Sequence, residues 1–366
     1  MPSEWASPRI PSPRVGDEIV VAGEFLHTDA PNRVVCWFDP GGFDAYRTTP
    51  ALPMDTAPGA TPKQVAELGG AKGEVARYGS RRLRRRRLES PGTAGVSPPS
   101  PPQSPPRGGA GAPVTDADDL TECITQLVMH HDGCGRSREC FRVLHDERGL
   151  SCHFLVDADG RVFQTLDVAE RAWHATDAND VSVGIELASL GAFREPQDAN
   201  VTPFDVTDHE NCVEHRDFER GCVHGQTLVQ KIFTDEQYDA VARLYATLLK
   251  RFPRLRLAYP IDRKASPGEA AEDDWMVFAR TGCAFPDVDT DKLTDARRRD
   301  FAGALGHFHV QRNKFDPGPA FDWKRLISET RAAFVAAGGV DASSGVGPRP
   351  PETGEGRRAS SPCPRA

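Results

Sequence analysis

The stretch NDVSVGIELASL, residues 179–190, has the clearest strand pattern of the chain. Its branched apolar side chains alternate and so share one face of an extended strand: Val181, Val183, Ile185 and Leu187. Glu186 projects from the opposite face, among small residues. A buried carboxylate is costly unless it is paired or has a function. The stretch predicts a buried strand and leaves two interpretations of Glu186, a structural ion pair and a functional carboxylate.

On either side of this stretch, further apolar runs predict strands and amphipathic runs predict helices. The strand runs are Cys123–Met129, His153–Val156 and Ala304–Val310. A capping box formed by Thr234 and Gln237 begins one helix. Asp322 caps a second helix, which ends at Gly338. Together these elements predict an α/β fold over residues 116–338, with a mixed central β-sheet flanked by helices.

The remaining segments differ from this region in composition. Residues 15–48 contain two short β-like runs and predict a small β extension, which we expect to pack on the main domain because two strands alone are marginally stable. Residues 49–115 form a linker rich in Pro, Ser, Gly and Arg, which cannot bury a core. We expect disorder in residues 1–14 and in the tail, residues 339–366.

The chain has 45 basic and 53 acidic residues, for a net charge of −8. Its main basic feature is an arginine run at residues 81–87, which we interpret as a solvated linker segment rather than an electrostatic tether or an import signal. Outside the arginine run, acidic residues outnumber basic ones, which argues against nucleic-acid binding. The sequence contains no run of about 18 apolar residues, so it predicts no membrane-spanning helix. No apolar leader is visible, so a cytoplasmic location is the default expectation, with non-standard secretion left open.

Chemistry-bearing residues gather in GHFHVQRNKFDPGPAFDW, residues 306–323. If this segment begins as a strand, His307 and His309 face the same side. Asp316 follows in a segment whose prolines restrict the backbone. Two imidazoles and a carboxylate with an open fourth position make a catalytic zinc site. The alternative interpretation is a polar turn after a strand.

A further histidine pair ends the apolar run CITQLVMH, residues 123–130. His130 and His131 are neighbours, so only one of them can face a given site. A single histidine at the end of a strand is more often structural than functional, and both interpretations of His130 stay open on this segment alone.

Five segments in this order resemble the zinc-dependent N-acetylmuramoyl-L-alanine amidases of the type 2 family, a superfamily that includes phage amidase lysozymes and peptidoglycan recognition proteins. The segments are LVMHHD (127–132), SCHFLVDADGRVFQTLD (151–167), ERAWHA (170–175), NDVSVGIEL (179–187) and residues 306–323. The resemblance implies that His130, His307 and Asp316 bind Zn²⁺. It also implies a peptidoglycan or muropeptide substrate, cut between N-acetylmuramic acid and L-alanine.

The same resemblance assigns roles to four other residues. Glu186 is the expected catalytic acid and base, and Lys314 is expected to stabilise the oxyanion. Trp173 and His174 are expected to line the substrate cleft. His131 and His309 are extra imidazoles near the expected metal site, which leaves open that one of them replaces an assigned ligand.

The resemblance also implies a disulfide between Cys134 and Cys140, as in peptidoglycan recognition proteins. The chain has an insertion at residues 193–227, and the donors in it allow a second, structural zinc site or an ordinary polar loop: His209, Cys212, His215, Cys222 and His224. Three functions remain to be distinguished: a working amidase, a non-catalytic peptidoglycan-binding module and a zinc-stabilised structural domain. The presence of Asp316 with Glu186 and Lys314 favours the enzyme.

Overall fold

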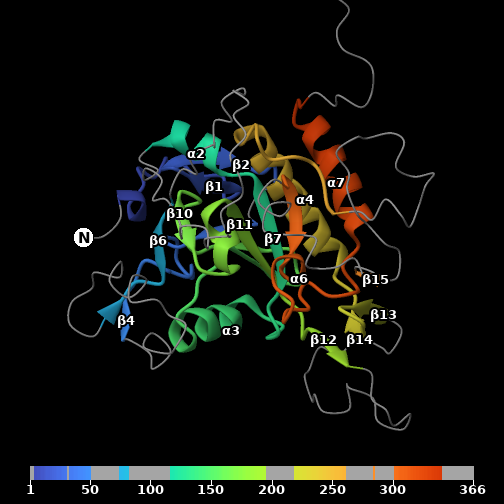
Figure 1. Cartoon of the computed structure of the whole chain (residues 1–366). Coiled ribbons are helices and arrows are strands. Elements are labelled where there is room, and N and C mark those ends of the chain that lie inside the picture. Colours follow the sequence, from blue (N-terminus) through green and yellow to red (C-terminus); the bar gives the residue numbers. More distant parts are fainter. Residues whose placement is uncertain are drawn as a thin grey trace, which may run out of the picture.

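A six-stranded mixed β-sheet forms the centre of the computed structural model (Figure 1). The structure describes residues 4–30, 33–50, 74–81, 116–194, 218–260, 283–284 and 301–339. In spatial order the strands are β16 (Gly303–Gly306), β7 (Gln126–His131), β11 (Ser182–Leu187), β8 (Phe154–Val156), β9 (Val162–Gln164) and β3 (Val34–Cys36). All neighbouring strands are parallel except β8 and β9. The predicted α/β class with a mixed central sheet is confirmed.

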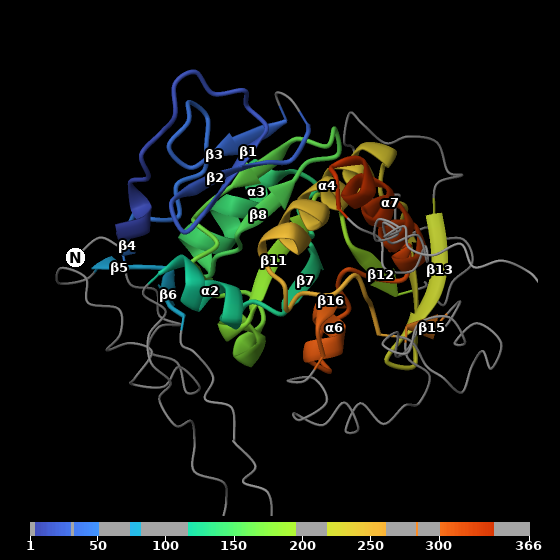
Figure 2. The ribbon, with the colours of Figure 1, turned by 90° about the horizontal axis from the view of Figure 1, so that it is seen from above.

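One face of this sheet is apolar and forms the main core. Alternate side chains of β7 and β11 point into it: Leu127, Met129, Val183 and Ile185. Helix α4 (Asp235–Arg251) covers this face, and helix α7 (Trp323–Ala336) packs against α4 (Figure 2). The expected caps are present, because Thr234 forms a capping box with Gln237 and Asp322 accepts the backbone N–H of Arg325. The opposite face carries two smaller apolar clusters together with polar side chains.

The run predicted as a strand over Ala304–Val310 divides into two elements. Strand β16 ends at Gly306, and a helical turn, α6 (His307–Val310), begins there. The physical reason is a local cap, since Nδ1 of His309 accepts the backbone N–H of Gly306 at 2.6 Å. Pro317 also packs tightly on Gly306, since a Cβ added to Gly306 would lie 2.7 Å from Cδ of Pro317. The prediction that His307 and His309 share a strand face is therefore wrong.

The N-terminal region is attached to the main sheet at the edge opposite β16. Strands β1 (Glu18–Val21) and β2 (Glu24–His27) form a hairpin, and β3 pairs with β9. Gln164 exchanges two hydrogen bonds of 2.7 Å with the backbone of Val20. We therefore find the expected packing of this extension on the main domain.

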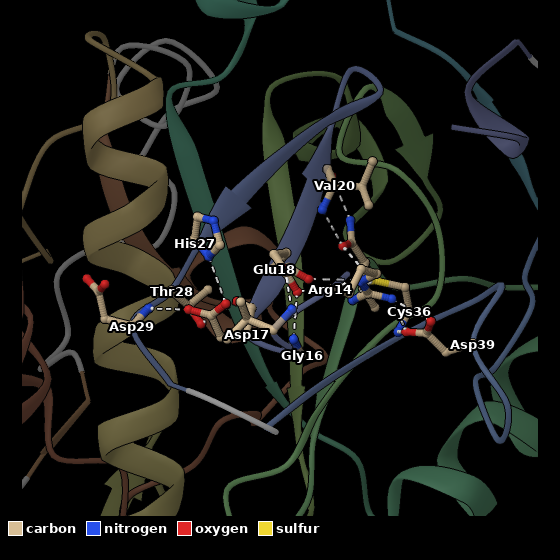
Figure 3. Close-up of polar contacts among 12 residues, drawn as sticks. Arg14, Gly16, Asp17, Glu18, Val20, His27, Thr28, Asp29, Cys36 and Asp39 are labelled. Atoms are coloured by element: carbon tan, nitrogen blue, oxygen red, sulfur yellow. Dashed lines mark hydrogen bonds and ion pairs between the residues drawn. The ribbon is translucent and has the colours of Figure 1, made fainter. Parts of the chain in front are cut away.

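Polar contacts hold the start of this extension (Figure 3). The Glu18 carboxylate accepts the N–H groups of Val15 and Gly16. Arg14, which lies in the segment expected to be disordered, forms an ion pair with Asp39. The carboxylate of Asp17 accepts from His27 and from the backbone of Asp29. Asp17, Glu18 and His27 come together as a metal-binding triad would, yet both carboxylates already have these partners. These contacts stabilise the hairpin of β1 and β2.

Residues 74–81 also belong to the folded structure, although the composition places them in the linker. Strand β6 (Tyr78–Ser80) pairs with β10 (Glu170–Ala172), and β4 (Thr49–Pro50) pairs with β5 (Glu74–Val75). Arg81, the first residue of the arginine run, is completely buried. Its guanidinium donates to four backbone carbonyls, those of Val168, Asn179, Asp180 and Ser182. Arg81 is thus a core residue and not part of a solvated segment, whereas residues 82–87 lie outside the described residues.

Shorter elements complete the described chain. They are η1 (Glu4–Ala6), α2 (Ala117–Cys123), α3 (Ser137–Phe141), the π-helical turn η3 (Arg142–Glu147) and the 3₁₀ turn η4 (Thr176–Asp180). A second sheet has the order β12 (Ala192–Arg194), β14 (Gln226–Lys231), β13 (Phe218–Val223) and β15 (Cys283–Ala284). The insertion supplies part of this sheet, while three of its metal donors lie outside the described residues: His209, Cys212 and His215. Among the helices of the described segments, none is long and apolar enough to span a lipid bilayer.

Candidate metal centre

The carboxyl ends of parallel strands bring the candidate residues together. His130 on β7 and Glu186 on β11 are register partners, so their side chains emerge on the same face. The last residue of β16, Gly306, pairs with Met129, which brings His307 next to His130. The ring centroids of the two histidines are 4.6 Å apart. Ligand sites of open α/β sheets lie at this end of the strands.

Asp316 closes a three-residue cluster with these two histidines. One of its oxygens, Oδ2, lies 2.8 Å from Nδ1 of His130 and 2.9 Å from Nδ1 of His307. Each of the three residues offers one atom that could bind a metal ion, and these three atoms lie within 4.8 Å of one another. The loop that carries Asp316 is tied to α6, since the Asp316 carbonyl accepts the Phe308 N–H. His130 and Asp316, which are 186 positions apart in the chain, thus lie in direct contact.

The electrostatics of the cluster favour a bound cation. Burial, with the charge of His307, lowers the pKa of His130 to about 4, so this imidazole is neutral at pH 7. Burial alone would raise the pKa of Asp316, but its contacts with His130 and His307 hold it well below the usual range. A carboxylate and neutral imidazole nitrogens are the ligands that zinc takes in proteins.

The outer nitrogens of both histidines have hydrogen-bond partners of their own. Nε2 of His130 lies 3.0 Å from Nδ1 of His174, and Nε2 of His307 lies 2.6 Å from Oε1 of Gln311. Metal-binding histidines usually use their second nitrogen in this way. Without a metal, the Nδ1 atoms can hydrogen-bond to Oδ2 of Asp316; with the ring protons on Nε2 instead, a cation would take the place of the Nδ1 protons between the two rings and the carboxylate. The residues present therefore fit a zinc ion held by His130, His307 and Asp316.

Glu186 and Lys314 provide the charged groups beside the cluster. The Glu186 side chain is buried, and its Oε2 has no hydrogen-bond partner among the described residues. Burial raises the pKa of Glu186 well above its usual value, and the charges of Asp316 and Asp132 raise it further. The charge of Lys314 acts in the opposite direction on Glu186 and also lowers the pKa of His130. The fold thus holds one carboxyl group with a high proton affinity, which the charge of Lys314 partly offsets.

The other histidines and Trp173 lie in different surroundings. Trp173 is half-buried, and a Cβ on Gly79 would lie 3.6 Å from its Nε1. His309 is buried against Phe308 and Trp323, where its Nδ1 caps α6. His131 follows His130 on β7, and its Nδ1 has no partner among the described residues. The close contacts with Asp316 involve His130 and His307, which agrees with the ligands implied by the resemblance.

One supporting residue was missed from the sequence, and a second was given a different role. Gln311 was missed because it lies four residues after His307, a spacing that puts them on one face only in a helix, and the segment was expected to be a strand. His174 was assigned to the substrate cleft, whereas in the structure its ring contacts His130. No local signal predicts that second contact, since the two residues are 44 positions apart.

Cys134 and Cys140 are free thiols in the structure, so the implied disulfide is absent from it. Both belong to a cluster of apolar residues near β8. Burial raises the pKa of Cys134 to about 11, which leaves this thiol protonated at neutral pH.

The fold and the site define a class: a mixed α/β protein that presents two histidines and one aspartate at the carboxyl end of its sheet. Residues 120–319, more than half of the chain, match the family model described as N-acetylmuramoyl-L-alanine amidase. The chain therefore belongs to the N-acetylmuramoyl-L-alanine amidase family. Among curated proteins, no sequence matches it.

Several solved structures are similar to part of the chain. A selenomethionyl AmpD derivative has 19% identity and a TM-score of 0.30, over 57% of this chain and 86% of that one. AmiD from E. coli, in complex with the substrate anhydro-N-acetylmuramic acid-L-Ala-D-γ-Glu-L-Lys, has 18% identity and a TM-score of 0.32, over 56% of this chain and 57% of its own. The endolysin amidase LysCS from Clostridium intestinale URNW has 13% identity and a TM-score of 0.31, over 58% and 86% of the two chains.

Proposed function

We propose that the protein uses zinc to hydrolyse the amide bond between N-acetylmuramic acid and L-alanine in peptidoglycan or muropeptides. Family membership supports the reaction class. The observation that carries the proposal is the convergence of His130, His307 and Asp316 beside Glu186 and Lys314. Three protein ligands leave an open position for a substrate or water, as catalytic zinc sites require.

When bound, zinc would supply a Lewis acid that polarises the scissile carbonyl and lowers the pKa of a water molecule. Glu186 supplies the proton transfer: its carboxylate takes a proton from the attacking water and delivers it to the leaving amine. Burial suits Glu186 to this task because it raises the affinity of the carboxyl group for a proton. Lys314 stabilises the negative charge that develops on the carbonyl oxygen, a contribution typically of about 10²–10³ in rate.

A chelator experiment with mass detection tests the proposal. The purified protein is incubated with a muramoyl-peptide such as anhydro-N-acetylmuramoyl-L-Ala-D-γ-Glu-L-Lys, before and after chelation and after zinc is restored. We expect free peptide in the untreated sample, none after chelation, and recovery with zinc. Peptide binding without cleavage would instead identify a recognition module.

The ligand assignment is tested with two variants. His130→Ala should abolish both zinc binding and turnover, because the variant lacks a neutral, buried imidazole nitrogen that would bind zinc. His309→Asn is the matched control, since an asparagine oxygen can accept the Gly306 N–H in place of Nδ1. It should keep stoichiometric zinc. Loss of zinc in the control, with retention in His130→Ala, would show that His309 is the ligand.

A further inference from the structure

His174 lies against the back of the first candidate ligand. Its Nδ1 is 3.0 Å from Nε2 of His130, and the two rings meet edge to face with centroids 5.2 Å apart. The strand below it has a glycine at this point, where a Cβ on Gly184 would lie 2.7 Å from Cγ of His174. The imidazole therefore occupies space that any other residue at position 184 would take.

The hydrogen bonds around His174 have one consistent direction when His130 binds a cation. With its Nδ1 lone pair at the metal, neutral His130 carries its proton on Nε2 and donates it to Nδ1 of His174. His174 then carries its own proton on Nε2, which faces Oγ of Ser182 at 3.3 Å. The Ser182 hydroxyl in turn donates to the Ala178 carbonyl at 2.7 Å. Every donor in this chain meets an acceptor.

The segment around His174 is held from two sides. Oδ1 of Asn179 accepts the backbone N–H groups of His174 and Ala175, at 3.2 and 2.6 Å. The buried guanidinium of Arg81 donates to the carbonyls of Asn179 and Ser182, at 2.9 and 2.8 Å. Arg81 lies before the residues that match the family model. A part of the chain outside that match thus fixes the turn that carries His174.

We propose that His174 is a positioning residue that keeps the proton of His130 on Nε2 and so leaves Nδ1 free to bind zinc. The inference rests on the proposed zinc site and deepens it. It replaces the substrate-cleft role that the resemblance implies for His174. Outer partners of metal-binding histidines typically contribute about 10–100-fold to metal affinity or activity.

Two substitutions at this position separate hydrogen bonding from packing. His174→Phe keeps a ring above Gly184 but removes the acceptor, whereas the side-chain oxygen of His174→Asn can take the place of Nδ1. Zinc affinity is measured by competition with a chelating dye, and the melting temperature of each variant is recorded beside it. We expect His174→Phe to bind zinc about 10–100-fold more weakly and His174→Asn to recover most of this loss.

Equal zinc affinity of His174→Phe and the original protein would overturn the inference, and so would an equal loss in both variants. A raised KM with unchanged zinc affinity would return His174 to the substrate cleft. If neither variant folds, ¹⁵N-histidine spectra of the zinc-loaded original protein decide: His174 must carry its proton on Nε2, and the opposite tautomer refutes the inference. Failure of the original protein to bind zinc refutes the proposed function instead.

Discussion

At the scale of single residues, the surroundings shift the pKa values of two carboxyl groups in opposite directions. Asp316 has a pKa held well below the usual range by two histidines, which overcome the effect of burial. Glu186 has a pKa raised well above its usual value by burial, and the charge of Lys314 acts in the opposite direction. One group therefore stays ionised, as the proposed metal ligand must be, while the other has the proton affinity that the proposed acid and base needs.

Glu186→Gln tests this division of roles. The amide keeps the shape of the side chain but cannot carry a proton between water and the leaving amine, so turnover should fall by about 10²–10⁴. Zinc content should stay at the original level, because Glu186 is not a ligand in this assignment. Glu170→Gln, a change at another buried glutamate on β10, is the control and should leave turnover unchanged. A fully active Glu186→Gln protein would remove the assigned role.

At the scale of secondary-structure elements, short segments decide where the functional side chains point. The end of β16 at Gly306 turns His307 toward Asp316 and His309 away from it. Strand β6 brings Arg81 under the turn η4 and the start of β11. Burial lowers the pKa of Arg81 to about 10, which still leaves the guanidinium charged at neutral pH.

Arg81→Lys should destabilise the fold. A lysine cannot reproduce the planar set of donors that Arg81 offers to four carbonyls. Loss of even one such charged hydrogen bond costs about 1.5–3 kcal/mol of unfolding free energy. Urea denaturation measures the change, and Arg142→Lys on the exposed surface of η3 serves as the control. A solvated role for Arg81 would give both variants the same midpoint.

At the scale of the whole molecule, buried neutral histidines connect stability to pH. Burial and the adjacent charge of Arg81 lower the pKa of His153 well below its usual value. The unfolded chain therefore binds a proton below about pH 6.5, whereas the folded chain does not. The contribution of His153 to stability decreases as the pH falls through this value. His27 behaves oppositely, since its contact with Asp17 raises its pKa and stabilises the protonated folded form.

Unfolding free energies between pH 7.5 and about pH 5 test this sign. His153→Asn should be less stable than the original protein at pH 7.5, and the difference should shrink by up to about 1.4 kcal/mol per pH unit below 6.5. In His27→Asn, the loss of stability should instead grow as the pH falls. A constant difference for His153→Asn would show that this histidine does not titrate on unfolding.

Most of the secondary structure and the identity of the central residues could be predicted from the sequence. The alternation of Val183 and Ile185 predicts β11, and the caps at Thr234 and Asp322 predict helices α4 and α7. These signals are local, because strand alternation and helix caps involve residues within about four positions of each other. The ligands implied by the resemblance are the three residues that converge in the structure.

The tertiary structure alone decided the surroundings of these residues. The hydrogen bonds between Arg81 and Ser182 and between His130 and His174 join residues 101 and 44 positions apart, and no local period encodes them. The burial of Arg81 could not be predicted either, because its neighbours in the chain read as a solvated run. A charged side chain is stable in a core only where hydrogen-bond partners or opposite charges surround it. For Arg81 these partners are carbonyls far away in the sequence, and they come together only once the chain has folded.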